Sequence, residues 1–447
     1  MTSTLAASSS ATTGAAVQLG VVGPANEYIS SDPDTTLFRF DGALRHSNWA
    51  EAEALAQQPA QLGMGKKSTF KVERVGDYLG PITLAYQLPA VVAETGLTPA
   101  ATDVFHYSNE IAFASIQKSV VRIGTNTFWE VGGEWYHLRE VLTKHSNKRG
   151  REYLGYYDTP GELMAACRHT QDIYAPLDLW FTEQKSHAFP IMPLTGQSFW
   201  IDIVFRTLAE LSVETGAFIG ETTFSKASVG TAPDFQNLEL VCSYFQLEKF
   251  ERDTMAEGAW EWLVFVPRLA ATHTHASSET SAKISIQTQN SVGAIYWVCQ
   301  RDAVILSGTA NQGNDWFNYS GVSVSNALYP GASTFSTKPY DPFTNAAIIF
   351  NTTPRSLQFN ASWWRTMSFR QYHTSIPDDF IYGKIFSENI EMHGSAQGHA
   401  NIGILDSCTL NITFPSGATA WTGEVRVYTY EYNYFQTAFG VAIKNFE

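Results

Sequence analysis

Hydrophobic and polar residues alternate along most of the chain, and this period of two predicts β-strands. In residues 199–206, FWIDIVFR, a Phe or an Ile stands at every second position, as expected for a strand with one face in a core. The opposite face carries Trp200 and Val204, so it is partly apolar as well. The pattern therefore raises the question of what covers the second face.

Other segments show strand patterns of different kinds. In residues 82–88, Ile, Leu, Tyr and Leu share one face. Residues 293–300, GAIYWVCQ, are a continuous apolar run, which predicts a strand buried on both faces. Residues 428–434 place four tyrosines on one side of a strand, and such a ladder fits an interface because a buried ring can keep its hydroxyl near a partner. The alternative is an exposed edge strand stiffened by aromatic residues.

Short helices are predicted between the strands. Residues 133–145 show the period of an amphipathic helix. Thr159, with Pro160 at the first helical position and Glu162 three residues after the cap, forms a capping box that begins a second helix. Residues 248–258 predict a third. We interpret the first two as insertions between strands, because they are too small to form a layer.

Length and segment order predict two domains. A chain of 447 residues exceeds what one hydrophobic core usually serves. We predict an N-terminal arm (1–24), a first domain (25–213), a Gly-, Ser- and Thr-rich connection (214–236) and a second domain (237–447). Many short strands and few helices indicate an all-β protein with two β-sandwiches in tandem. The pattern alone does not distinguish jelly rolls from other Greek-key sandwiches.

Composition argues against several classes of protein. The chain is 44% hydrophobic, 16% charged and carries a net charge of −14, whereas direct nucleic-acid binding needs basic surface. The one dense basic run, Lys144 to Arg151, is interpreted as a solvated helix end and loop. The N-terminal residues do not form a secretory signal, and no run approaches 18 apolar residues. We therefore expect synthesis in the cytoplasm and no membrane span.

Residues that could carry chemistry are few and scattered. The sequence holds no motif for nucleophilic, nucleotide-dependent or metal-dependent catalysis, so we expect no enzyme activity, no catalytic residue and no cofactor. The cysteines have no paired spacing, which predicts neither a disulfide framework nor a zinc site, and two of them are predicted to be buried small hydrophobes, Cys242 and Cys299. The four cysteines are Cys167, Cys242, Cys299 and Cys408.

Two groups of polar residues are candidate metal ligands. His273 and His275 share one face if extended, but a third ligand is not evident nearby, so we interpret them as polar residues at a strand or loop edge. Glu391, His393 and His399 are interpreted as loop residues. In a chain without a secretory signal most N-glycosylation sequons should stay unmodified. The sequons begin at Asn318, Asn351, Asn360 and Asn411.

Several segments together resemble the major capsid proteins of nucleocytoplasmic large DNA viruses. The residues that match the family's N-terminal signature are Gln18, Leu19, Gly23, Tyr28, Pro33, Phe38, Asn48 and Trp49. Four later segments match in the family's order: RVGDYLGPITLAYQLPA, APLDLWFTEQKSHAFPIMPL, GAIYWVCQ and YHTSIPDDFIYGKIFSENIE. The resemblance spans nearly the whole chain. It departs at HGSAQGHANIGILDS, where the family often has Pro-Ser-Gly and Ser-Arg-Ile.

The resemblance implies a structural role. It implies two tandem eight-stranded jelly rolls with short helices inserted in loops, and three chains in a pseudo-hexagonal capsomer that tiles an icosahedral shell. It implies that the protein resides in the virion, is assembled in the host cytoplasm, and contacts neighbouring capsomers together with minor capsid and penton proteins. A membrane beneath the shell would not be spanned by this chain. Long loops, including Ser307 to Pro342 and part of Phe128 to Arg168, would form towers on the outer side.

Two other functions remain open from the sequence. The first is a carbohydrate-binding β-sandwich, which the many aromatic residues and the pair Trp363-Trp364 favour, although no carboxylate pair for glycoside hydrolysis stands out. The second is a minor double jelly-roll capsid protein. Tryptophans exposed on a concave surface would favour the first, whereas buried tryptophans would favour a shell subunit.

Overall fold

The computed structural model describes residues 47–59, 61–90, 105–143, 148–157, 160–214, 234–257, 259–305, 314–321, 340–351, 353–377, 379–388, 390–391, 398–438 and 440–444. The predicted N-terminal arm, most of the predicted connection, Thr159 and His393 lie outside these residues.

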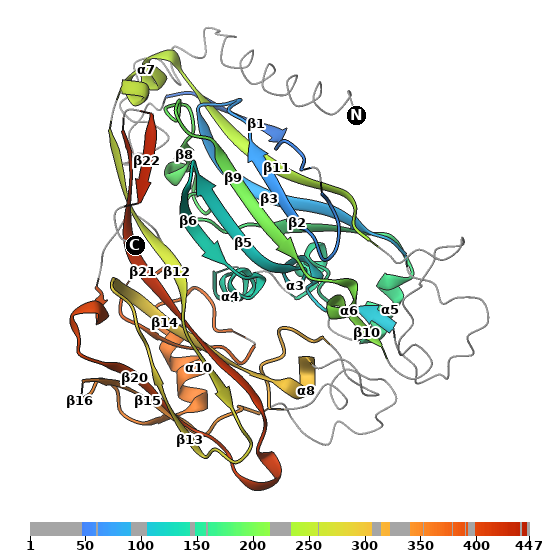
Figure 1. Cartoon of the computed structure of the whole chain (residues 1–447), viewed down its shortest axis with the longest axis vertical. Coiled ribbons are helices and arrows are strands. Elements are labelled where there is room, and N and C mark those ends of the chain that lie inside the picture. Colours follow the sequence, from blue (N-terminus) through green and yellow to red (C-terminus); the bar gives the residue numbers. More distant parts are fainter. Residues whose placement is uncertain are drawn as a thin grey trace.

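The first sandwich consists of two antiparallel sheets, β1-β11-β3-β7 and β2-β9-β5-β6, and the short strand β8 (Phe189–Pro190) also pairs with β3 (Figure 1). Their inward faces carry the alternating apolar residues predicted from the sequence, so that Ile201 and Ile203 have no exposed surface. The strands are β1 (Trp49–Leu55), β2 (Lys67–Val72), β3 (Tyr78–Leu88), β5 (Ile116–Ile123), β6 (Asn126–Val131), β7 (Gln171–Pro176), β9 (Phe199–Phe205) and β11 (Gln236–Leu247).

The second sandwich repeats this arrangement with sheets β12-β21-β14-β18 and β13-β20-β15-β16. Two of its strands, β12 and β21, are 16 residues long and extend back along the first sandwich (Figure 1). The strands are β12 (Trp260–His275), β13 (Ser281–Ser285), β14 (Ser291–Arg301), β15 (Asn345–Phe350), β16 (Thr353–Pro354), β18 (Tyr382–Ile385), β20 (Cys408–Thr413) and β21 (Gly423–Ala438).

Both sandwiches have jelly-roll topology. Counted along each sandwich, the first, eighth, third and sixth strands form one sheet, and the second, seventh, fourth and fifth form the other. This is the order of two interleaved Greek keys that defines the jelly roll. The prediction of two tandem eight-stranded jelly rolls is therefore confirmed. Shorter strands extend these sheets or lie beside them: β4 (Phe105–Tyr107), β8 (Phe189–Pro190), β10 (Ser212–Glu214), β17 (Phe359–Asn360), β19 (Ala400–Asn401) and β22 (Val441–Lys444).

The boundary between the two jelly rolls differs from the prediction. We expected the second domain to begin at residue 237, but β11 lies between β1 and β3, with Ala50 opposite Gln246 and Leu84 opposite Leu240. It is the eighth strand of the first jelly roll. The connection to the second is the helix α7 (Lys249–Glu257), which the sequence did predict.

Helices occupy the connections between strands, as predicted. In the first jelly roll, α4 and α5 lie between β6 and β7, while α3 and α6 flank β5 and β9. In the second, α10 lies between β17 and β18. The helices are α3 (Ile111–Ala114), α4 (Gly133–Thr143), α5 (Pro160–Cys167), α6 (Leu208–Leu211), α8 (Asp302–Ile305) and α10 (Ala361–Arg370), and the longer 3-10 segment is η1 (Lys148–Leu154). Within the described part of the chain, none of the helices has both the length and the apolar character needed to span a bilayer.

Strand β14 is buried on both faces, as its continuous apolar run predicted. Trp297 and Ile295 point into the core of the second jelly roll, whereas Tyr296 and Val298 belong to the hydrophobic cluster of the first. The sheet β12-β21-β14-β18 is thus covered on one side by its own jelly roll and on the other by its neighbour in the same chain.

Candidate functional site at the seam between the jelly rolls

The tyrosine ladder of residues 428–434 lies on β21, where the two jelly rolls of the chain contact each other. We call this interface the seam. Strand β21 is a central strand, so the alternative of an exposed edge is wrong. Tyr428, Tyr430 and Tyr432 are buried, while Tyr434 is 40% exposed. The predicted interface is therefore confirmed for three of the four rings, and it forms within one chain.

Helix α4 supplies the first jelly roll's side of the seam. The ring of Trp135 lies 5.2 Å from that of Tyr430, 5.8 Å from that of Tyr428 and 6.0 Å from that of Tyr296, measured between centroids. Because Trp135 is 1% exposed, these contacts form a buried aromatic cluster. Through Trp135, α4 thus faces the second jelly roll.

Next to Trp135, a buried ion pair joins the two jelly rolls. Arg426 on β21 donates to both carboxylate oxygens of Glu134 on α4, from Nη2 at 2.6 Å and from Nε at 2.8 Å. The hydroxyl of Tyr319 donates to Glu134 Oε1 at 2.9 Å, and that of Tyr428 donates to Oε2. Burial alone would raise the pKa of Glu134, but Arg426 and the two hydroxyls outweigh it and lower the pKa.

A second buried ionic group holds α4 against its own jelly roll. Glu110 pairs with His137 Nδ1 and accepts a hydrogen bond from Arg151 Nη1 at 2.7 Å. Burial favours the neutral form of His137, but the carboxylate of Glu110 outweighs it and raises the pKa of the imidazole. Arg151 belongs to the basic run that we interpreted as solvated. For this residue the interpretation is wrong, because Arg151 is 6% exposed and paired.

Part of the long loop between β14 and β15 also reaches the seam. We expected Ser307 to Pro342 to be a long loop that forms a tower, and its described residues 314–321 are fixed to the first jelly roll by hydrogen bonds. The side chains of Asn314 and Trp316 donate to backbone carbonyls of residues 209–212 at 2.7–2.8 Å. Tyr319, from the same segment, is buried against Glu134. The aromatic cluster in DWFNY was the sequence signal for this anchor.

An open crevice of about 520 Å³ lies beside the seam. Lys118 and Glu130 line it from the first jelly roll, and Arg268 and Leu269 from the second. Charges of both signs share its wall with the exposed Leu269 and with aromatic residues.

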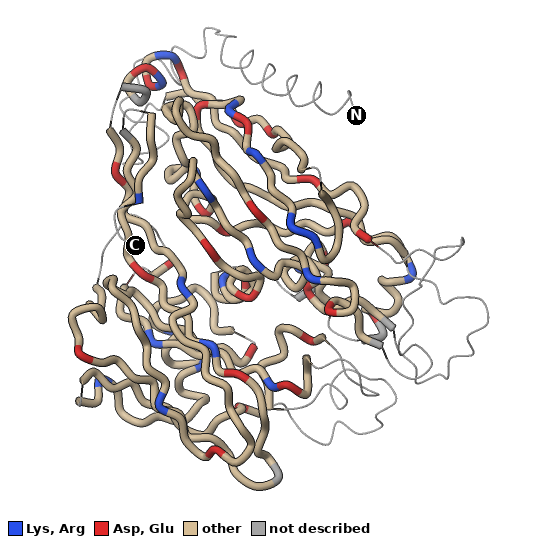
Figure 2. Tube along the Cα trace, viewed as in Figure 1, with Lys and Arg blue, Asp and Glu red and all other residues tan. Residues whose placement is uncertain are grey.

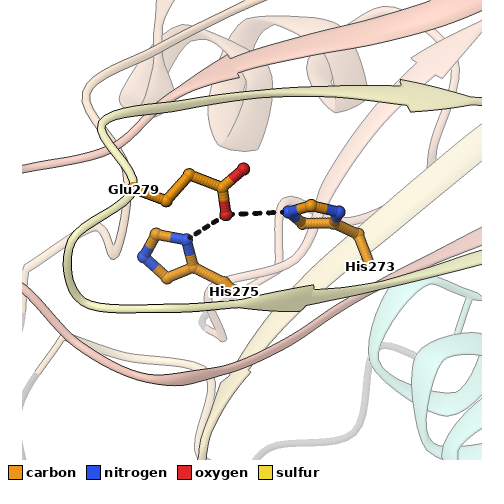
Figure 3. A group of neighbouring side chains, drawn as sticks. All are labelled: His273, His275 and Glu279. Carbon is orange, nitrogen blue, oxygen red and sulfur yellow. Dashed lines mark hydrogen bonds and ion pairs between the residues drawn. The ribbon is translucent and has the colours of Figure 1, made fainter.

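The histidine pair gains a third potential ligand in the structure. His273 Nε2 lies 3.0 Å and His275 Nδ1 lies 3.2 Å from the same carboxylate oxygen of Glu279 (Figure 3). Burial lowers the pKa of His275, and Glu279 only partly opposes this effect. The expectation that no third ligand lies near the two histidines is therefore wrong, because Glu279 follows His275 by four residues.

The other predicted polar candidates are dispersed. Glu391 accepts a hydrogen bond from the backbone N–H of Thr374 at 2.8 Å and pairs with His373, so it supports a loop, as interpreted. His399 is exposed, and its ring meets that of Tyr432 edge to face. These residues do not form a common site with the pair at His273.

The predicted sequons differ in exposure. Asn351 and Asn360 are exposed, and Asn360 Oδ1 caps helix α10. Asn318 and Asn411 are partly buried, and Asn318 Oδ1 accepts a hydrogen bond from Ser320 Oγ at 2.7 Å. That most of the four sequons stay unmodified remains a prediction.

All four cysteines are free and buried. This confirms the predicted burial of Cys242 and Cys299, and burial raises the pKa of the Cys242 thiol to about 12.

The two adjacent tryptophans do not form an exposed binding platform. Trp364 has no exposed surface, and its indole N–H donates to the Ala346 carbonyl at 3.1 Å. Trp363 is partly buried and stacks on Phe359 at 4.0 Å. Their positions argue against the carbohydrate-binding alternative.

Acidic and basic positions are interspersed over both jelly rolls in the view of Figure 2. Asp202, for example, pairs with Arg122 at 2.9 Å and with Lys67 at 3.1 Å on the outer face of the first jelly roll. This pairing neutralises Arg122 and Lys67 locally, so these two cations do not form a free basic pair for phosphates.

Comparisons with known proteins agree with the topology of two tandem jelly rolls. Residues 36–248 match the family model of the major capsid protein N-terminus, and residues 251–446 match that of the large eukaryotic DNA virus major capsid protein. The chain belongs to the large DNA virus major capsid protein family. The two matched ranges meet within α7, where strand pairing also divides the jelly rolls.

Individual members of the major capsid protein family are similar at low identity. Capsid protein 1 of Acanthamoeba polyphaga mimivirus is 24% identical over 73% of this chain, which spans only 54% of that protein's length. The major capsid protein of Phaeocystis pouchetii virus is 20% identical, with 96% of this chain and 98% of that protein covered. Among solved structures, PBCV-1 VP54 matches with a TM-score of 0.71, 16% identity and coverage of 92% and 99% of the two chains. The Faustovirus major capsid protein matches with a TM-score of 0.64, 12% identity and coverage of 96% and 97%.

One capsid-family segment noted in the sequence, residues 372–391, contributes to the seam. His373 Nε2 lies 3.1 Å from the Tyr296 hydroxyl, and Ser375 Oγ donates to the carbonyl of Val141 at 2.9 Å. The segment therefore ties the C-terminal end of α4 to the second jelly roll.

Proposed function

We propose that this major capsid protein builds the shell as a homotrimer with a pseudo-hexagonal outline. The observation that supports this most directly is that one chain holds two jelly rolls of identical strand order, joined through α4 and β21. Three such chains around an axis would supply six similar corners. The buried seam would keep the two corners of each chain at a fixed distance.

Neighbouring chains would cover the apolar side chains that one chain leaves exposed. Scattered exposed apolar residues are normal, but here several are large and lie on both jelly rolls. On the second jelly roll, Tyr434 and Ile443 lie on the neighbouring strands β21 and β22. The most exposed are Phe250, Leu269, Leu357, Met367, Ile376, Ile404, Tyr174 and Ile443.

The remaining features of the proposal follow from the same role. Adjacent capsomers, minor capsid proteins and penton proteins would be the partners, and the genome would not be bound directly. A membrane beneath the shell would lie outside this chain. We infer a structural role without catalysis, assembly in the host cytoplasm, and an N-terminal arm over residues 1–24.

Sedimentation velocity of the purified chain tests the trimer. We expect a single species of about 150 kDa, three times the 49.5 kDa of one chain, that persists at micromolar concentration. A monodisperse 49.5 kDa species would contradict the proposal. The copy number of this chain in purified particles separates a major from a minor capsid protein, because a major subunit dominates the protein mass.

A further inference from the structure

We propose that His273, His275 and Glu279 form a binding site for one divalent transition-metal ion, of which Zn²⁺ is the best match. The site lies at the corner between β12 and β13, in the second jelly roll. It is separate from the seam, and it goes beyond the proposed shell function.

The backbone brings the three side chains together. His273 and His275 are two residues apart at the end of β12, so their side chains leave the strand on the same face. The chain then turns, with the Glu279 N–H donating to the Ala276 carbonyl at 2.9 Å. This turn carries the carboxylate back over the two imidazoles (Figure 3).

The distances between the potential ligand atoms are close to those between the ligands of a bound metal ion. One potential ligand atom from each residue lies within 4.8 Å of the other two, and the two nitrogen–oxygen distances are 3.0 and 3.2 Å. Two ligands at about 2.0–2.1 Å from a tetrahedral Zn²⁺ are separated by about 3.3 Å. Small rotations of the side chains would therefore admit the ion.

One ligand is held rigidly and the other two face solvent. The His275 side chain has no exposed surface, and its ring stacks on Phe414 at 3.8 Å and lies 4.4 Å from Trp421. The side chains of His273 and Glu279 are 27% and 29% exposed, so an ion has a route from solvent. Water would occupy the fourth position.

The ligand types select the metal. Two imidazoles and one carboxylate, with an open fourth position, suit Zn²⁺ and other late first-row ions, whereas Ca²⁺ and Mg²⁺ prefer shells of oxygen ligands. Bound there, the ion would link the end of β12 to the start of the β13 hairpin through side chains rather than through the sheet.

The test is a titration of the purified full-length chain, freed of metal with a chelator that is then removed. We expect ZnCl₂ to bind in calorimetry with one ion per chain at this site and to raise the melting temperature. Co²⁺ should give the visible absorption bands of a tetrahedral site. His273→Ala and Glu279→Gln should each weaken Zn²⁺ binding at least tenfold, and the double variant should lose the Co²⁺ bands.

The control is His169→Ala, which removes an exposed histidine in the first jelly roll and should leave binding unchanged. His273 and Glu279 are partly exposed, so their variants should melt like the wild-type protein in chelator. The absence of saturable Zn²⁺ binding to the wild-type chain would overturn the proposal. Equal Zn²⁺ affinity in the wild-type chain and the double variant would also overturn it, because the ion would then bind elsewhere.

Discussion

Glu134 and Arg426 form a two-point ion pair across the seam, although 292 residues separate them in the sequence. Each charge is mostly shielded from solvent, with 11% and 18% of the two side chains exposed. The pair therefore makes the stability of each jelly roll depend on its contact with the other.

Replacing Glu134 with Gln should destabilise the protein strongly. The variant removes the two-point partner of Arg426 and leaves its mostly buried guanidinium only the half-exposed carboxylate of Glu424, at 3.2 Å. Breaking a buried pair from one side costs about 3–5 kcal/mol. Urea unfolding followed by tryptophan fluorescence measures this loss as a decrease in the free energy of unfolding.

The matched control is Glu130→Gln, four residues earlier. Glu130 pairs with Lys118 at 2.6 Å, but both side chains are about half exposed, so the loss should be about 0–1 kcal/mol. Equal losses of unfolding free energy for the two variants would show that the Glu134–Arg426 pair stabilises the protein no more than the exposed pair does.

Replacing a tryptophan with alanine should cost more stability on the buried face of a sheet than on its outer face. Trp297 has no exposed surface, so Trp297→Ala should cost about 3–5 kcal/mol. Trp200 lies partly exposed on the outer face of β9, with Lys71 Nζ 6.0 Å from its ring centroid, and Trp200→Ala should cost about 1 kcal/mol. Thermal unfolding of the two variants should rank them in this order, and the reverse order would refute the assignment of faces.

His106 should make the protein less stable in mild acid. Burial lowers the pKa of its imidazole from 6.5 to about 4, and the side chain is 1% exposed. Between these two values the unfolded chain binds more protons than the folded one. The free energy of unfolding should therefore fall as the pH decreases from 6.5 to 4, by about 3 kcal/mol from this residue.

Denaturant unfolding at several pH values, compared between the wild-type chain and His106→Asn, measures this contribution. The variant should show a shallower pH dependence over the same range, while replacement of the exposed His169 by Asn should leave it unchanged. An unaltered slope in His106→Asn would mean that other groups govern the acid response.

The sequence predicted the parts of the fold that depend on local patterns. The alternation in β9, the two-sided burial of β14 and the amphipathic character of α4 follow from residues close together in the chain. Each was visible because its period decides which side chains share a face.

What the sequence did not predict depends on distant partners. Strand β11 looked like the start of a new domain because its partner β1 lies far back in the chain. Arg151 looked solvated for the same reason, since its partner Glu110 is 41 residues away. Glu279 is a different case, because it lies four residues from His275 and could have been found by assuming a turn.

The position of β11 also has a consequence for biosynthesis. Among the described strands β1 pairs with β11 at the edge of its sheet, and roughly 180 residues lie between Leu55 and Gln236. At about 5–20 residues per second, a ribosome needs roughly 10–40 s to make that intervening segment. Throughout this interval the nascent β1 lacks β11, so productive folding requires that chaperones or rapid local collapse keep β1 from pairing with another emerging chain.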